Sequence, residues 1–169
     1  MKNIILIGMP GAGKSTMGVI LAKTLGIDFM DTDIEIQKRT GELLYKTLER
    51  VGVKGLLDEE EEAIKSLDLS KKRCVVATGG SAVLREESMK HLKKNGICVY
   101  LYLPYSVVSR RVNNRNTRGI AAEAHETLKN IYEFREPYYR KYADFIIDCR
   151  GNSADKNVSE ILRVLIGID

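Results

Sequence analysis

The sequence has few of the features that mark disulfide-rich, metal-binding or redox proteins. It contains three cysteines, Cys74, Cys98 and Cys149, an odd number that lie far apart in or beside apolar runs. This pattern favours buried structural thiols over metal or redox roles.

Long apolar stretches, repeats, low-complexity segments and proline-rich linkers are also missing. No apolar stretch approaches about 18 residues, the length that a membrane helix needs. The start of the chain, Met1-Lys2-Asn3, leads into a strand-like run without a cleavable signal pattern. We therefore expect one domain over residues 1–169, a cytoplasmic location and no membrane partner.

Charge of one sign is not concentrated anywhere. The net charge of +4 comes from 27 basic and 23 acidic residues without a long basic block. This balance is too mild to indicate nucleic acid, and a nucleotide or phosphorylated substrate explains it as well. The acidic run at residues 58–62 is interpreted as a solvated helix face rather than a metal site. We expect a monomer that binds a small molecule.

The most informative segment that is present is a glycine-rich loop at residues 8–15, which reads Gly8-Met9-Pro10-Gly11-Ala12-Gly13-Lys14-Ser15. It matches the phosphate-binding pattern G-x-x-x-x-G-K-[ST], with an apolar run before it and a helical pattern over 16–25 after it. In such a loop the backbone N–H groups surround a phosphate, Lys14 reaches the outer phosphates and Ser15 coordinates magnesium. The loop predicts a nucleoside triphosphate enzyme, and a glycine turn without a ligand is the alternative.

Apolar strand candidates alternate with helical patterns along the chain. The candidates lie at residues 4–8, 29–30, 74–77, 98–103 and 145–148. Continuous apolar strands separated by helices predict a parallel sheet that is covered by helices on both faces. Residues 113–123 are polar and basic, and we expect them to form a mobile flap.

Polar residues follow two of these strands. Asp31-Thr32-Asp33 comes after the second, and Thr78-Gly79-Gly80 ends the third. Ligands of open α/β sheets bind at the carboxyl ends of strands. One carboxylate can hold magnesium while the other accepts a proton from a substrate hydroxyl, although Asp33 can also serve as a helix N-cap. The glycine pair allows a substrate to approach the backbone, and a tight turn is the alternative.

Arginines lie in or beside the flap and in one later helix. Phosphoryl transfer spreads negative charge over the transferred oxygens, and a guanidinium on a closing flap stabilises that charge. Of Arg111, Arg115 and Arg118, we favour Arg118 because it lies inside the flap.

Together these segments resemble the shikimate kinase family, which has the nucleoside-monophosphate-kinase type of P-loop fold. The resemblance runs from residue 4 to about residue 148, on residues 8–16, 31–33, 39–41, 78–80 and 116–118, and on Arg135, Pro137, Tyr139 and Ala143-Asp144. It implies a three-layer α/β/α fold with a five-stranded parallel sheet of order 2-3-1-4-5 and a substrate-binding helical segment near 33–66. The implied reaction is the transfer of the γ-phosphate of ATP to shikimate, giving shikimate 3-phosphate, in the shikimate pathway of aromatic amino acid biosynthesis.

The resemblance also implies roles by position. ATP would contact Gly11, Ala12, Gly13, Lys14, Ser15 and Thr16, with Arg111 beside adenine, and Mg²⁺ would contact Ser15 and Asp31. The acceptor would contact Asp33, Gly79, Gly80 and Arg135. The catalytic groups would be Asp33 on the acceptor hydroxyl, Lys14 on the phosphates and Arg118 on the transferred phosphate.

Three departures from the family pattern fall on the acceptor side and the flap. The family's Phe-Arg pair is replaced by Leu56-Leu57-Asp58, a third glycine by Ser81, and an Arg-Pro-Leu flap segment by Arg118-Gly119-Ile120. Two alternatives therefore stay open: a P-loop kinase of another small hydroxylated acid, polyol or nucleoside, and a nucleotide-binding switch without turnover. The Asn-Lys-x-Asp pattern of GTPases is absent.

Overall fold

The structure is a computed structural model that describes residues 2–112 and 119–166. It contains five strands, β1 (Asn3–Ile7), β2 (Asp28–Asp31), β3 (Cys74–Ala77), β4 (Gly96–Tyr102) and β5 (Phe145–Asp148). The α-helices are α1 (Lys14–Leu25), α2 (Thr32–Thr40), α3 (Leu44–Lys65), α4 (Glu86–Lys94), α5 (Tyr105–Arg111), α6 (Leu128–Tyr142) and α7 (Ala154–Leu165). A short 3₁₀ helix, η1 (Ala82–Leu84), follows β3.

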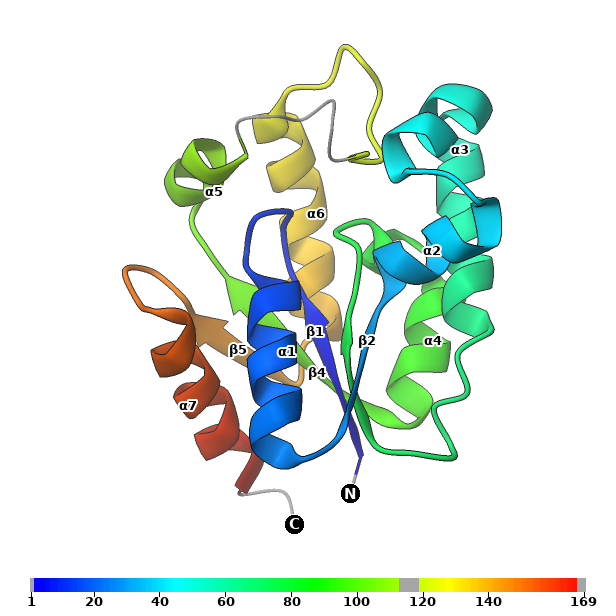
Figure 1. Cartoon of the computed structure of the whole chain (residues 1–169). Coiled ribbons are helices and arrows are strands. Elements are labelled where there is room, and N and C mark those ends of the chain that lie inside the picture. Colours follow the sequence, from blue (N-terminus) through cyan, green and yellow to red (C-terminus); the bar gives the residue numbers. More distant parts are fainter. Residues whose placement is uncertain (1, 113–118, 167–169) are drawn as a thin grey trace.

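The five strands form one parallel sheet of order β2-β3-β1-β4-β5. Helices α1 and α7 lie on one face of the sheet, and α4 and α6 lie on the other (Figure 1). This arrangement confirms the parallel sheet with helices on both faces that the sequence pattern predicts, and the strand order that the family resemblance implies.

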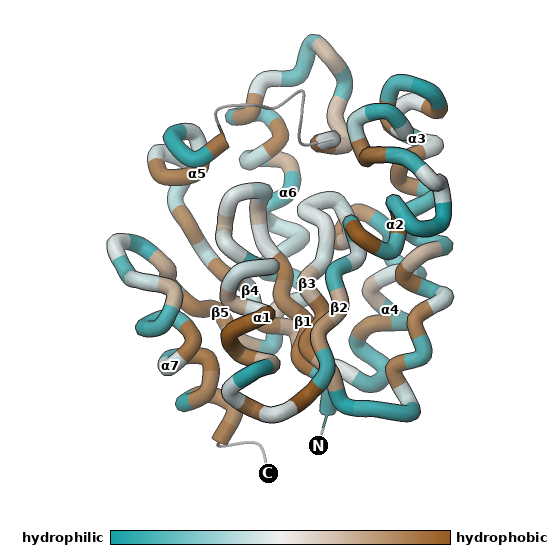
Figure 2. The backbone as a smooth tube through the Cα atoms, viewed as in Figure 1, coloured by the Kyte–Doolittle hydropathy of each residue, from teal (hydrophilic) through white to brown (hydrophobic). Residues whose placement is uncertain are grey.

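The core is built around the central strand. All five residues of β1 are buried, and Ile4 pairs with Val75 on one side and with Ile97 on the other. Figure 2 shows apolar residues along the central strands and polar residues on the outer helices. A strand that is covered on both faces has a continuous apolar sequence, which is why the strands of this sheet could be predicted. The three cysteines are buried and free, as expected for structural thiols.

The carboxyl ends of the strands meet at one edge of the sheet, at the top in Figure 1. The phosphate loop (residues 8–15) leaves β1 there, α2 begins directly after β2, and residues 78–81 leave β3. Helix α3 is broken at Gly52, which has φ 70° and ψ −177°. Within the described ranges, no helix combines the length and apolar character that crossing a membrane requires.

Candidate active site

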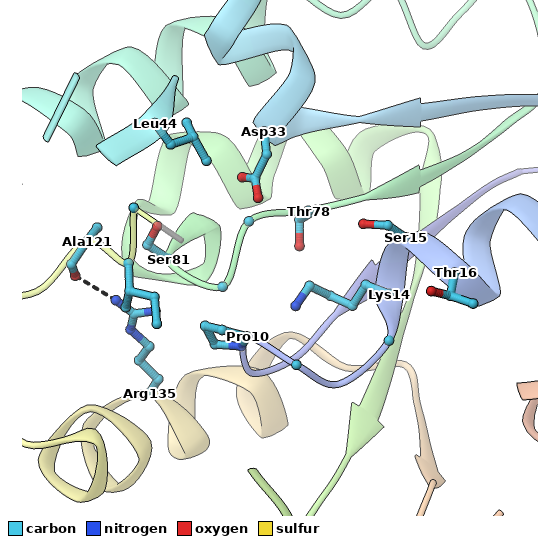
Figure 3. Close-up of a pocket in the computed structure, with 16 residues that line it drawn as sticks. Pro10, Lys14, Ser15, Thr16, Asp33, Leu44, Thr78, Ser81, Ala121 and Arg135 are labelled. Carbon is cyan, nitrogen blue, oxygen red and sulfur yellow. Dashed lines mark hydrogen bonds between the residues drawn. The ribbon is translucent and has the colours of Figure 1, made fainter. Parts of the chain in front are cut away.

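A cavity of about 400 Å³ opens at this edge of the sheet. Its walls are the phosphate loop, Asp33 from α2, residues 78–81, residues 119–121 and Arg135 from α6 (Figure 3). We call residues 119–121 the lid return, because they are the part of the predicted flap (113–123) that lines the cavity. The side chains that line the cavity thus come from segments that are more than 100 residues apart in the sequence.

The phosphate loop holds Lys14 in a buried position. Gly8, Gly11 and Gly13 have positive φ angles of 147°, 81° and 88°, which side-chain-bearing residues rarely adopt. Lys14 Nζ donates hydrogen bonds to the carbonyl oxygens of Gly8 at 2.7 Å and Met9 at 2.8 Å. Burial lowers the pKa of Lys14 to about 8, although the charges of the two nearby aspartates oppose this shift. The ammonium group is a cation that is held where the loop would receive phosphates.

Ser15 and Asp31 form an oxygen pair beside the loop. Ser15 Oγ donates to Asp31 Oδ2 at 2.6 Å, and the other carboxylate oxygen accepts from the backbone N–H of Asp33 at 3.0 Å. Asp31 is therefore the N-cap of α2, and the alternative interpretation of Asp33 as the cap is wrong. One carboxylate and one hydroxyl fit Mg²⁺, a hard cation that takes few protein ligands and fills its other positions with phosphate and water. No group of three or more His, Cys, Asp or Glu side chains that could hold a metal occurs in the described ranges.

Because Asp31 caps α2, the carboxylate of Asp33 does not serve as the cap, and it points into the cavity (Figure 3). Burial and the neighbouring Asp31 raise the pKa of Asp33 to about 6, while Lys14 opposes the shift. A carboxylate with this pKa is largely ionised at neutral pH and more basic than an ordinary aspartate, as a general base requires.

Arg135 lies across the cavity from Asp33 and is 2% exposed. Its Nη2 donates to the Ala121 carbonyl oxygen in the lid return at 2.6 Å. A Cβ on Gly80 would stand 3.2 Å from its Nη1. Tyr139, one turn further along α6, donates its hydroxyl to the Gly80 carbonyl oxygen at 2.6 Å. A buried guanidinium on this wall offers a charge-assisted contact to an acidic group of an acceptor.

The glycine pair is closely approached by side chains. A Cβ on Gly79 would stand 2.2 Å from Glu60 Oε1 and 2.8 Å from Asp33 Oδ1, and one on Gly80 would stand 2.8 Å from Pro10 Cδ. Larger residues would therefore displace the groups that surround the cavity. The backbone of this segment is held in place, because the Gly79 N–H donates to Thr32 Oγ1 at 2.8 Å.

Sequence reasoning missed Glu60. The interpretation of residues 58–62 as a solvated helix face is wrong for this residue, because Glu60 is 2% exposed and accepts a hydrogen bond from Ser81 Oγ at 2.6 Å. The spacing of the buried residues Leu56, Glu60, Ala63 and Ile64 on α3 is the signal that could have found it. Asp58 is on the outside of the helix and pairs with Arg85 at 2.6 Å.

Some of the remaining predicted residues are described by the structure and others are not. Ala12 is buried within the phosphate loop, Thr16 lines the cavity, and Arg111 Nη1 donates to the Gly11 carbonyl oxygen at 3.2 Å. Arg118 and the flap residues 113–118 lie outside the described residues. In the lid return, Ile120 and Ala121 are each 6% exposed. The structure therefore brings together the predicted residues that it describes.

Comparisons with known proteins agree with this geometry. A model of the family described as shikimate kinase matches residues 10–166. The shikimate kinase of Thermodesulfovibrio yellowstonii is 40% identical over 165 residues, which cover 96% of this chain and 94% of that protein. Two solved structures, each 32% identical, are also similar. The shikimate kinase from Acinetobacter baumannii in complex with shikimate has a TM-score of 0.90 over 99% of this chain and 94% of that one. The shikimate kinase from Aquifex aeolicus has a TM-score of 0.84 over 98% of this chain and 96% of that one.

Proposed function

The chain belongs to the shikimate kinase family and is an ATP-dependent small-molecule kinase, and on that premise we propose that it phosphorylates the 3-hydroxyl of shikimate with Mg²⁺-ATP. The observation that carries the proposal is the meeting of three groups in one cavity. Lys14 lies at the phosphate loop, and Asp33 and Arg135 face one another beside it. These groups suit a triphosphate, a reacting hydroxyl and an acceptor carboxylate.

Each residue has a distinct proposed task. Lys14 and the N–H groups of the phosphate loop bind the β- and γ-phosphates, and Ser15 and Asp31 would hold Mg²⁺, which neutralises phosphate charge when bound. Asp33 accepts the proton of the acceptor hydroxyl as that oxygen attacks the γ-phosphorus. The bond from that phosphorus to the bridging oxygen breaks, so ADP leaves.

Arg135 binds the acceptor carboxylate, and the small residues Gly79 and Gly80 let the acceptor lie close to the backbone. Arg118 is proposed to neutralise charge on the transferred phosphate, and Arg111 to lie beside adenine. We further propose one domain with a flap at 113–123 that acts as a cytoplasmic monomer without nucleic acid or membrane partners. Elution near 19 kDa in size-exclusion chromatography tests the monomer.

A second acceptor class is favoured by one observation. Leu56 and Leu57 pack into an apolar cluster with Ile36 and Ala63, so α3 presents no arginine to the cavity from this position. An acceptor carboxylate would therefore meet one guanidinium, that of Arg135, on the walls that the structure describes. An uncharged polyol or nucleoside is the competing acceptor that this observation favours, and another hydroxylated acid is a further alternative.

The test is ADP release from Mg²⁺-ATP in the presence of shikimate, sugar acids, polyols, amino acids or nucleosides. The proposal predicts that shikimate gives the highest kcat/KM. A higher value for an uncharged alcohol would replace shikimate as the acceptor. Tight nucleotide binding without acceptor-stimulated turnover would favour a nucleotide switch.

A further inference from the structure

Glu60 is a buried acid that pairs with no cation among the residues that the structure describes. It lies on the inner face of α3 at 2% exposure, whereas the side chains of Asp58 and Glu62 on the same helix are 54% and 55% exposed. Within the described ranges no ion pair joins Glu60 to a lysine or arginine, and the hydroxyl of Ser81 is its hydrogen-bond donor. Burying an ionised carboxylate with a single neutral partner is costly, so the protonated form is favoured.

Glu60 does not itself line the cavity but contacts two residues that do, Gly79 and Ser81. A Cβ on Gly79 would stand 2.2 Å from Glu60 Oε1 and 2.8 Å from Asp33 Oδ1, so the Glu60 and Asp33 carboxylates lie close together on one side of Gly79. The charged groups that act on it are Asp33, Arg135 and Lys14, which all face the cavity. A buried charge is weakly screened by solvent, so the charge of an ionised Glu60 would act on a carboxylate that is bound in the cavity.

We propose that Glu60, held by Ser81, is a positioning residue that makes the affinity for a carboxylate-bearing acceptor depend on pH, a proposal that rests on the proposed function of this site. When Glu60 is protonated, Arg135 is available to the acceptor carboxylate. When Glu60 is ionised, its charge repels that carboxylate and competes with it for Arg135.

The direction of the effect follows from the titration of the facing groups. Burial raises the pKa of Glu60 to about 7, with Asp33 adding to the shift and Ser81, Arg135 and Lys14 opposing it. The KM for the acceptor should therefore rise as the pH increases from 6 to 8.5. Asp33 and Lys14 also titrate in or near this interval, but they act on the reacting hydroxyl and the phosphates. Their titration should appear in kcat and in the KM for ATP.

The experiment measures the KM and kcat for shikimate at saturating Mg²⁺-ATP between pH 6 and 8.5. For the wild type we expect the KM to rise roughly tenfold, the effect of one nearby, weakly screened charge. Glu60→Gln keeps an oxygen that accepts from Ser81 but cannot ionise, so its KM should stay at the low-pH value throughout. Glu62→Gln, on the exposed face of α3, is the matched control and should keep the wild-type profile.

Ser81→Ala provides a second variant that does not alter Glu60 itself. The Ser81 hydrogen bond lowers the Glu60 pKa, so its removal should shift the midpoint of the KM rise to higher pH. The methyl ester of shikimate, which lacks the negative charge, should show no rise with the wild type.

The outcomes separate the two proposals. Turnover of shikimate with a flat KM, or with the same rise in Glu60→Gln, would overturn the role of Glu60 alone. A rise that persists with the methyl ester would also overturn it. No turnover of shikimate at any pH would contradict the proposed function and this inference together.

Discussion

Replacing Asp33 by asparagine tests the proposed general base without disturbing the start of α2. The cap of that helix is Asp31, which accepts from the backbone N–H of residue 33 at 3.0 Å, and asparagine keeps this N–H. Asparagine also keeps the shape of the side chain that points into the cavity. The substitution therefore removes a proton acceptor and a buried charge, and little else.

The site gives the expected size of two effects of Asp33→Asn, the loss in kcat and the change in the free energy of unfolding. A positioned general base typically contributes about 10²- to 10⁴-fold in rate, so kcat should fall at least about a hundredfold. The pKa of Asp33 is raised from 3.8 to about 6. The folded state therefore favours the protonated carboxyl. The contribution of Asp33 to the free energy of unfolding is complete below pH 3.8 and is lost as the pH rises through 6. At pH 8 the wild type holds an unfavourable charge, so Asp33→Asn should stabilise the protein by about 1 to 3 kcal/mol.

The assay combines steady-state kinetics with thermal unfolding at pH 8. We expect the variant to lose turnover, to keep its affinity for Mg²⁺-ATP and to show an unchanged or higher Tm. For the wild type, kcat should fall as the pH drops below about 6, because the base becomes protonated. An asparagine variant with kcat within about threefold of the wild type would refute the assignment of Asp33 as the base.

Three further substitutions probe the other walls of the cavity. Lys14→Ala should abolish turnover while circular dichroism shows an intact fold, and unchanged activity would contradict the role of the phosphate loop. Arg135→Ala should raise the KM for shikimate by roughly 10- to 150-fold, the effect of losing a charge-assisted hydrogen bond of about 1.5 to 3 kcal/mol. An unchanged KM would show that Arg135 does not bind the acceptor. Gly119→Ala should lower kcat/KM at least about fivefold, because its Cβ would stand 2.5 Å from Leu44 Cβ and would displace the lid return. Gly151→Ala is its control, because Gly151 has a similar φ of 64° but open space around it, and equal losses in kcat/KM would show that the lid return does not matter.

The sheet and the phosphate loop could be predicted because their signals are local. Buried parallel strands are continuous apolar runs, as β3 at Cys74–Ala77 shows, and the loop needs glycines and a lysine at fixed spacing. The meeting of Asp31 and Asp33 with the loop also followed, because the carboxyl ends of parallel strands share one edge of the sheet.

The errors arose where two local patterns competed. Helix α2 begins immediately after β2, without a connecting loop, so the cap is the last strand residue, Asp31, rather than the residue before the apolar pattern. In the run 58–62 the charges predict exposure, whereas the spacing of Leu56, Glu60 and Ala63 predicts a buried face. Only the packing of α3 against the residues after β3 decides that Glu60 is inside, and that contact joins segments 21 residues apart.

NMR analysis of the product that the wild type forms from Mg²⁺-ATP and shikimate tests the proposed reaction most directly. We expect one new ³¹P phosphomonoester signal that couples to the proton on carbon 3 of shikimate, with ADP formed in equal amount, and no such signal with Lys14→Ala. ATP turnover that leaves shikimate unmodified, or a phosphate on a different hydroxyl, would contradict the claim that this cavity phosphorylates the 3-hydroxyl of shikimate.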